Sequence, residues 1–167
     1  TQGGSIRVLA DKGRREVQHS LLEGLRREAD LAYLGAYQSF ATNVAVSMQR
    51  LQRLLSRLRE NHRIAGYGAA AKGISMLNYC HIGTETLCYI ADDSPLKVGR
   101  FTPGAHIPIV EPRLLRKEPV DALLLLAWNF EDEIKGRLRG LPLQYINPIA
   151  PPVAQSRHLG ARSAHGN

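Results

Sequence analysis

The chain has 167 residues, of which 44% are hydrophobic and 22% charged, a composition typical of a globular protein with one sizeable core. Its formal net charge is +7, but the basic residues are dispersed and not interleaved with aromatic ones, so we expect no nucleic-acid partner. A basic surface that faces a phosphate ligand or an acidic partner explains the charge better. The longest apolar runs, such as the one at 123–128, are too short to span a bilayer, so we predict a cytoplasmic protein without a membrane partner.

Two cysteines, Cys80 and Cys88, suffice for neither a disulfide framework nor a zinc-ligand cluster, and we predict no metal site in this chain. The first residue is Thr1 and no signal-peptide pattern follows it, so we expect the chain to be cut from something longer. Residues 5–10 predict a short strand, and we interpret residues 1–13 as the end of an absent preceding domain with its linker.

Apolar residues at helical spacing predict a long N-terminal helical segment over 14–61, with one helix over 14–30 and another over 31–60. The second helix carries an apolar stripe formed by Phe40, Val44, Met48, Leu51, Leu54, Leu55 and Leu58. The stripe covers too few heptads for a coiled coil. We therefore expect this helix to pack on a sheet or to bridge two domains.

Strand and helix patterns alternate from His62 onward. Strands are predicted over 63–67, 86–91, 105–110, 120–127 and 143–149, and helices over 70–79, 112–117 and 130–139. This alternation predicts an α/β fold, a Rossmann-like parallel sheet flanked by helices, over residues 62–150. Residues 151–167 contain few large apolar side chains, and we predict a disordered tail there.

A glycine-rich turn, residues 66–73, follows the first of these strands and opens a helix. Gly66 would allow the tight turn, Gly68 would let a phosphate approach the backbone, and Ala71 would let helix and strand pack closely. Free amides at the helix start and the cation of Lys72 favour an anion there over a turn that binds nothing. Asp92 and Asp93 follow the second strand, where a dinucleotide fold places the acid that holds a ribose, although the same residues also suit an ordinary turn.

Several further motifs occur in a fixed order around this turn. They lie at residues 3–7, 66–73, 77–80, 92–104, 106–109 and 127–129. With these motifs the chain resembles the C-terminal domain of the SAM-dependent sugar C-methyltransferases, which methylate nucleotide-linked deoxysugars. The resemblance runs from Gly3 to about Ala150. Two positions depart from the family: Gln2 stands where a histidine is usual, and Ala70 where a proline is usual.

The resemblance implies that a zinc-binding domain and a SAM domain precede this region in the full-length enzyme. It implies that neither SAM nor zinc is bound by this chain, and that the family's acid and base residues lie upstream. The C-terminal domain closes over the substrate and helps to bind the nucleotide sugar. We therefore expect no catalytic residue here, an inactive isolated chain, and two partners, the nucleotide-sugar substrate and the upstream domains of the same polypeptide.

Side chains near the strand ends complete the candidate site, because ligands bind at the carboxyl ends of parallel strands. Lys97 and Arg100 could face a diphosphate, and Trp128 could stack on a base or cap the core. Asn78, His106 and Asn129 each have an equally plausible structural role, the last as the cap of the following helix. The substrate-binding candidates are Gly66, Tyr67, Gly68, Ala69, Ala70, Lys72, Gly73, Asn78, Asp93, Lys97, Arg100, His106, Trp128 and Asn129.

The favoured function is thus the substrate-binding and closing domain of a C-methyltransferase acting on a nucleotide-linked sugar. A stand-alone module that binds NAD or another nucleotide is the alternative, and a ribose contact from Asp92 or Asp93 would distinguish it. An interaction module that works through the helix at 31–60 is the third hypothesis.

Overall fold

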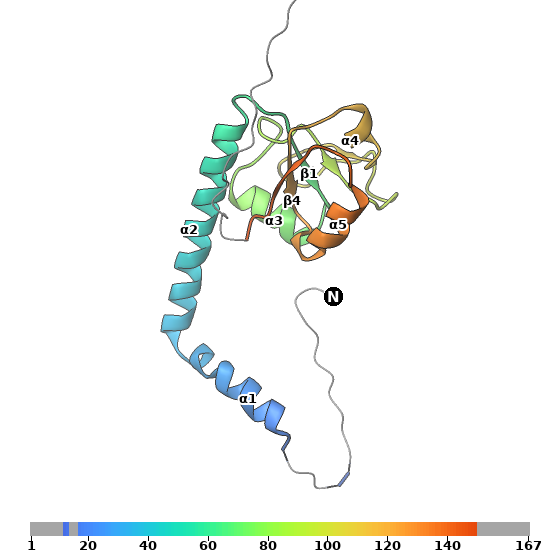
Figure 1. Cartoon of the computed structure of the whole chain (residues 1–167). Coiled ribbons are helices and arrows are strands. Elements are labelled where there is room, and N and C mark those ends of the chain that lie inside the picture. The colour runs from blue at the N-terminus through green and yellow to red at the C-terminus, as the bar shows by residue number, and fades with distance from the viewer. Residues whose placement is uncertain (1–11, 14–16, 150–167) are drawn as a thin grey trace, which may run out of the picture.

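The structure, a computed structural model, describes residues 12–13 and 17–149 (Figure 1). The strand predicted over 5–10 and the tail predicted over 151–167 lie outside these residues.

Five parallel strands form one sheet with the order β3-β2-β1-β4-β5. The strands are β1 (Ile64–Tyr67), β2 (Ile90–Ala91), β3 (Ile109–Val110), β4 (Ala122–Leu125) and β5 (Gln144–Ile146). In the centre of the sheet Gly66 of β1 lies between Ile90 and Leu124. The predicted parallel α/β sheet is confirmed, and its strand order is that of the Rossmann fold, which changes direction between β1 and β4.

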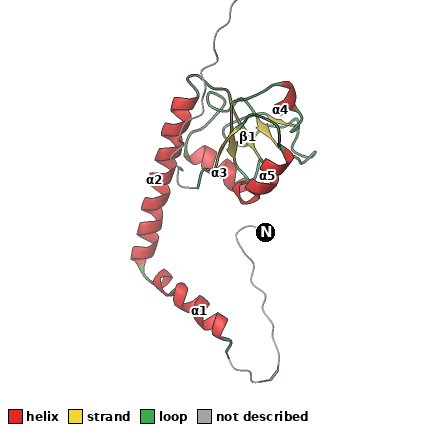
Figure 2. Cartoon of the chain, viewed as in Figure 1, coloured by secondary structure: helices red, strands yellow, loops and turns green. Residues whose placement is uncertain are grey.

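Helices cover both faces of the sheet (Figure 2). These helices are α2 (Leu34–Leu58), α3 (Ala71–Tyr79), α4 (Leu114–Lys117) and α5 (Glu131–Arg137), the last preceded by the 3₁₀ turn η2 (Trp128–Phe130). Alternate residues of β4 point to opposite faces: Leu124 packs with the α2 and α3 side chains, and Leu123 and Leu125 with those of α4 and α5. Because β4 is buried on both faces, its sequence is a continuous apolar run.

The strands are shorter than predicted, most clearly β2 and β3. The strand expected from Thr86 begins at Ile90, because the amides of Thr86 and Leu87 donate to the carbonyl of Gly83 and close a turn. The strand expected from Ala105 begins at Ile109, because the amide of His106 donates to the Thr102 carbonyl. His106 has a positive φ of 52°, which extended backbone does not have.

The N-terminal part of the described chain contains α1 (His19–Arg27), the 3₁₀ turn η1 (Ala29–Ala32) and α2. Near its C-terminal end α2 buries Met48, Leu51, Leu55 and Leu58 in the same cluster as the sheet residues. Phe40, which the sequence placed on the same stripe, is 69% exposed. The C-terminal half of α2 is therefore part of the Rossmann core, whereas its N-terminal half is not.

We expect Leu55→Ala to lower the free energy of unfolding by about 2–5 kcal/mol, because Leu55 is only 1% exposed and its loss leaves a cavity between α2 and the sheet. Urea denaturation followed by circular dichroism measures this change. The control is Leu96→Ala, at a 78% exposed position, which should change stability by less than about 0.5 kcal/mol. If both variants were equally stable, α2 would not contribute to the folding unit.

Candidate functional site

A pocket of about 490 Å³ opens at the carboxyl ends of β1, β2 and β4. It lies beside the point where the strand order changes direction, the usual ligand position in an open α/β sheet. Its lining residues are Tyr67, Gly68, Ala70, Asp92, Asp93, Ser94, Lys97, Ala127, Phe130, Glu133, Ile134 and Arg137. The pocket therefore brings together five of the predicted site residues, namely Tyr67, Gly68, Ala70, Asp93 and Lys97.

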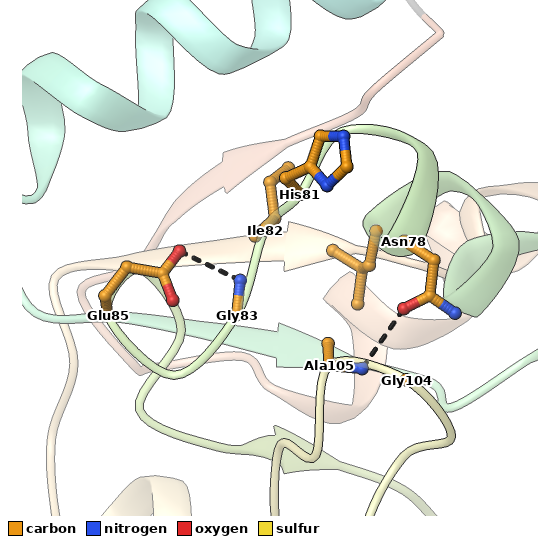
Figure 3. A pocket seen from close by; sticks show the side chains of 8 residues that line it. Asn78, His81, Ile82, Gly83, Glu85, Gly104 and Ala105 are labelled. Atoms are coloured by element: carbon orange, nitrogen blue, oxygen red, sulfur yellow. Dashed lines mark hydrogen bonds between the residues drawn. The ribbon is translucent and has the colours of Figure 1, made fainter.

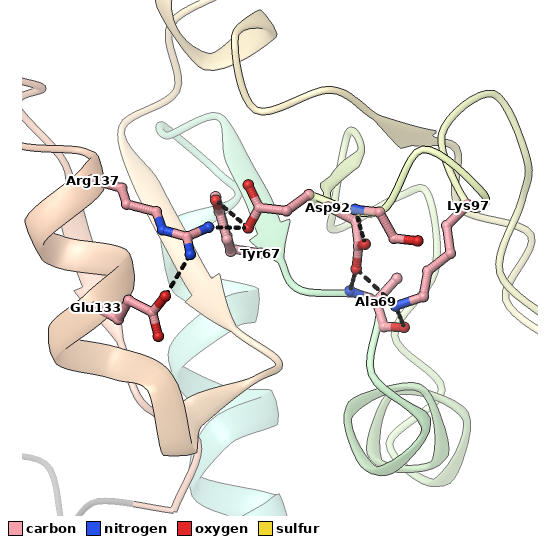
Figure 4. A network of polar contacts seen from close by, with 8 residues as sticks. Tyr67, Ala69, Asp92, Lys97, Glu133 and Arg137 are labelled. Carbon is pink, nitrogen blue, oxygen red and sulfur yellow. Dashed lines mark hydrogen bonds and ion pairs between the residues drawn. The ribbon is translucent and has the colours of Figure 1, made fainter. Parts of the chain in front are cut away.

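Asp92 holds the glycine-rich turn in place (Figure 4). Its side chain is 7% exposed, and its Oδ2 accepts a hydrogen bond of 2.6 Å from the amide of Ala69. Lys97 forms an ion pair of 3.1 Å with the same oxygen and donates to the Ala69 carbonyl at 3.0 Å. The amide of Ser94 donates to Oδ1 at 2.9 Å. The Ala69 amide, a predicted substrate-binding group, thus already donates its hydrogen bond to a carboxylate of the protein.

The glycines of the turn are required by packing within the protein. A side chain on Gly68, which has a φ of +83°, would place its Cβ 2.6 Å from the Cβ of Ala127. The expectation that Ala71 provides the close contact between helix and strand is wrong, because Ala71 is exposed. Gly73 provides it: a Cβ there would lie 2.8 Å from the carbonyl oxygen of Leu126. Ala127 therefore leaves no room for a side chain at position 68, which is sufficient reason for a glycine there.

An adenosine cofactor such as NAD or SAM would need a carboxylate at the end of β2 for its ribose. Both oxygens of Asp92 bind elsewhere, and Oδ2 of Asp93 accepts hydrogen bonds from Tyr67 and Arg137. Asp92 is therefore committed to the turn, and a ribose contact at this edge of the sheet would have to come from Asp93.

A second network crosses the pocket from β1 to α5 (Figure 4). The hydroxyl of Tyr67 donates to Asp93 Oδ2 at 3.0 Å, and Nη1 of Arg137 donates to the same oxygen at 2.8 Å. Arg137 also forms an ion pair with Glu133. The sequence pointed to neither Arg137 nor Glu133 as site residues, because they read as ordinary charges of a helix surface.

Three carboxylates and two cations line the pocket, so its charge is slightly negative. Burial, reinforced by the Asp93 carboxylate, raises the pKa of Tyr67 to about 12. Tyr67 is therefore protonated at neutral pH, and its hydroxyl remains a hydrogen-bond donor.

Lys72 lies over Trp128, with its Nζ 4.2 Å from the centroid of the ring. Trp128 is half-buried and packs against the core clusters on both faces of the sheet, as a residue that caps the core does. Within residues 17–149, the backbone amides of Ala71 and Lys72 at the start of α3 donate no hydrogen bond. These amides remain available to an acceptor outside the described chain.

Asn78 belongs to a different part of the surface, a smaller pocket of about 270 Å³ (Figure 3). Its Nδ2 donates to the carbonyl of Pro103 at 3.2 Å, and its Oδ1 accepts from the amide of Ala105 at 3.1 Å. The side chain therefore fastens α3 to the loop before β3, which is a structural role.

The remaining candidates do not line the larger pocket. His106 is exposed and stacks on Phe101, with 4.3 Å between ring centroids. Arg100 is exposed in the loop after β2. Asn129 lies in η2, and the prediction that it caps α5 is wrong: Phe130 holds the cap position, without a side-chain hydrogen bond.

Among the described residues, no group of three or more His, Cys, Asp or Glu side chains is placed to hold a metal ion. Burial raises the pKa of both thiols, Cys80 and Cys88, so both are protonated at neutral pH. No helix in the described part of the chain is long and apolar enough to cross a membrane.

The raised pKa of Tyr67 makes the protein less stable at high pH. Between pH 10 and about 12 the unfolded chain loses the Tyr67 proton while the folded chain keeps it, so stability falls as pH rises through this range. We expect Tyr67→Phe to reduce this fall and to remove one late-ionising phenol from the ultraviolet titration of tyrosinate. An unchanged late phase in Tyr67→Phe would contradict the assignment.

Comparison with known proteins gives two matches. A model of the family described as “C-methyltransferase C-terminal domain” matches residues 1–145. The chain is also 34% identical over 166 residues to “C-methyltransferase NovU” of Streptomyces niveus. This alignment covers 96% of the present chain and 39% of that protein. The chain thus spans about two fifths of the length of this curated relative. On the match over residues 1–145, the chain belongs to the C-methyltransferase C-terminal domain family.

Proposed function

We propose that the chain is the substrate-binding and closing domain of a SAM-dependent C-methyltransferase that acts on a nucleotide-linked sugar. The observation that carries this proposal is the pocket at the carboxyl ends of β1, β2 and β4. The match to the C-methyltransferase C-terminal domain family supports it. In this proposal the upstream part of the polypeptide holds SAM and zinc and performs the methyl transfer. This domain supplies binding contacts and excludes water from the reacting sugar.

The lining of the pocket suits a sugar ring. Sugar hydroxyls both donate and accept hydrogen bonds, and here the carboxylates of Asp93 and Glu133 accept while Arg137 donates. Phe130, which is 45% exposed, offers an apolar surface for the face of the ring. Because carboxylates outnumber cations in the pocket, a diphosphate is disfavoured inside it.

We place the diphosphate instead at the start of α3. The free amides of Ala71 and Lys72 and the ammonium of Lys72 lie there, and the helix dipole favours an anion. Lys97 is already paired with Asp92, so its positive charge is largely compensated. In this proposal Trp128 lies beside the nucleotide, under Lys72. The side chains of Arg100 and Asn129 lie at the periphery of the nucleotide sugar, and those of Asn78 and His106 do not contact it.

Lys72→Ala should weaken nucleotide-sugar binding about tenfold or more, because it removes one charge-assisted contact with the diphosphate. Calorimetric titration of the intact multidomain enzyme with a pyrimidine nucleotide diphosphate sugar measures the affinity. Added salt should weaken nucleotide-sugar binding by the parent protein more than binding by the variant, because salt screens part of the attraction between Lys72 and the diphosphate.

The matched control is Lys117→Ala, a cation exposed at the end of α4, close to the amino ends of the strands. It should bind like the parent protein. Equal affinity of the parent and Lys72→Ala would show that the turn at 66–73 is structural. The search for phosphate contacts would then move to the loop at 92–104.

We also expect the purified 167-residue chain to lack methyltransferase activity and to bind no SAM at micromolar concentration. The reason is that the described chain contains one Rossmann-like sheet, in which Asp92 is committed to the turn, and that the family resemblance places SAM in another domain. Calorimetry with SAM checks this expectation. Stoichiometric binding would overturn the assignment of SAM to another domain.

A further inference from the structure

The apolar stripe of α2 continues beyond the sheet on which the helix packs. Its members follow one another at steps of three and four residues: Tyr37, Ala41, Val44, Met48, Leu51, Leu55 and Leu58. The last four are buried in the Rossmann core, and Val44 is half-buried. Tyr37, on the same face, is 55% exposed. One continuous face of the helix is thus covered at one end and bare at the other.

The bare end is also free of charge. The sequence contains no charged residue from Leu31 to Gln49, whereas arginines recur from Arg50 to Arg59. A helix that faces water normally carries charged residues on its exposed side. The uncharged surface here runs around the helix and includes Phe40, which is 69% exposed.

The preceding elements extend this surface. Large apolar side chains are exposed on α1 and η1 as well as at the start of α2: Leu21, Leu22, Leu25, Leu31, Tyr33 and Leu34. Figure 1 shows α1 and the N-terminal half of α2 projecting away from the sheet. We call residues 19–46 the arm. Its large apolar surface marks a contact region, because single apolar residues on a surface are ordinary but a patch of this extent is not.

We propose that the arm docks on the methyl-donor domain of the same enzyme, the part of the polypeptide that precedes this chain; this rests on the proposed function. Three observations favour this occupant. The arm continues an interface that α2 already makes with the core. It lies at the N-terminal side of the chain, inside the family match over residues 1–145. The curated relative is much longer, since the aligned region covers 39% of it.

The docking partner must present an apolar surface with few charges, because the arm between Leu31 and Val46 offers neither a cation nor an anion. Docking through α2 would also fix the position of the sugar pocket. The far end of the same helix is packed on the sheet through Leu51 and Leu55, so a rigid helix connects the docked surface to the domain that carries the pocket.

Thiol footprinting tests the proposal. Phe40→Cys places a thiol on the arm, and Phe101→Cys places one at a 52% exposed position away from both pockets. Each variant is made in the 167-residue chain and in the intact multidomain enzyme, and alkylation is followed by peptide mass. Burial of the arm should slow labelling of Phe40→Cys about tenfold or more in the intact enzyme. Phe101→Cys should label equally fast in both proteins.

Three results would overturn the proposal. One is equal labelling of Phe40→Cys in both proteins. Another is protection in the 167-residue chain that grows with its concentration, which would assign the arm to a second copy. The third is protection of that chain by phosphatidylcholine vesicles, which would assign the arm to a lipid surface. Because no sugar ligand is present, these outcomes are independent of the Lys72→Ala titration.

Discussion

The carboxylate of Asp92 joins two segments at the carboxyl edge of the sheet: the turn at Ala69 and the loop that contains Ser94 and Lys97. A buried charge is tolerated only when hydrogen bonds and an opposite charge compensate for its lost hydration. Here two amides and one ammonium do so. The direction in which α3 leaves the turn and the place of Asp93 in the pocket wall both depend on this arrangement.

The sequence predicted the strand, turn and helix around residues 66–73 because glycine spacing and apolar runs are local signals. It did not predict what fills the space beside the glycines. A glycine approached by a phosphate and one approached by Ala127 have the same sequence signature. Likewise Ala71 and Gly73 are both small, and only the crossing of α3 over Leu126 decides which of them faces the strand.

The pocket network was beyond sequence reasoning for a different reason. Asp93 and Arg137 lie far apart in the chain and meet only because β2 ends, and the helix that follows β4 begins, at the same edge of the sheet. The predicted starts of β2 and β3 were wrong because backbone geometry overrode composition. The positive φ of His106 and the hydrogen bonds to the Gly83 carbonyl form turns in segments whose residues favour strands. The core of β4 was predictable because burial on both faces leaves a continuous apolar run.

Trp128 is the single tryptophan of the chain, and the fold places it where it touches both core clusters and lies beneath the ammonium of Lys72. Indole emission responds to nearby charge and to hydration, so this one residue is an intrinsic optical probe. Loss of packing on either face of the sheet exposes the ring to water. Displacement of the Lys72 ammonium removes a charge from the ring face. Intrinsic fluorescence therefore reports on folding and on the start of α3 without an added label.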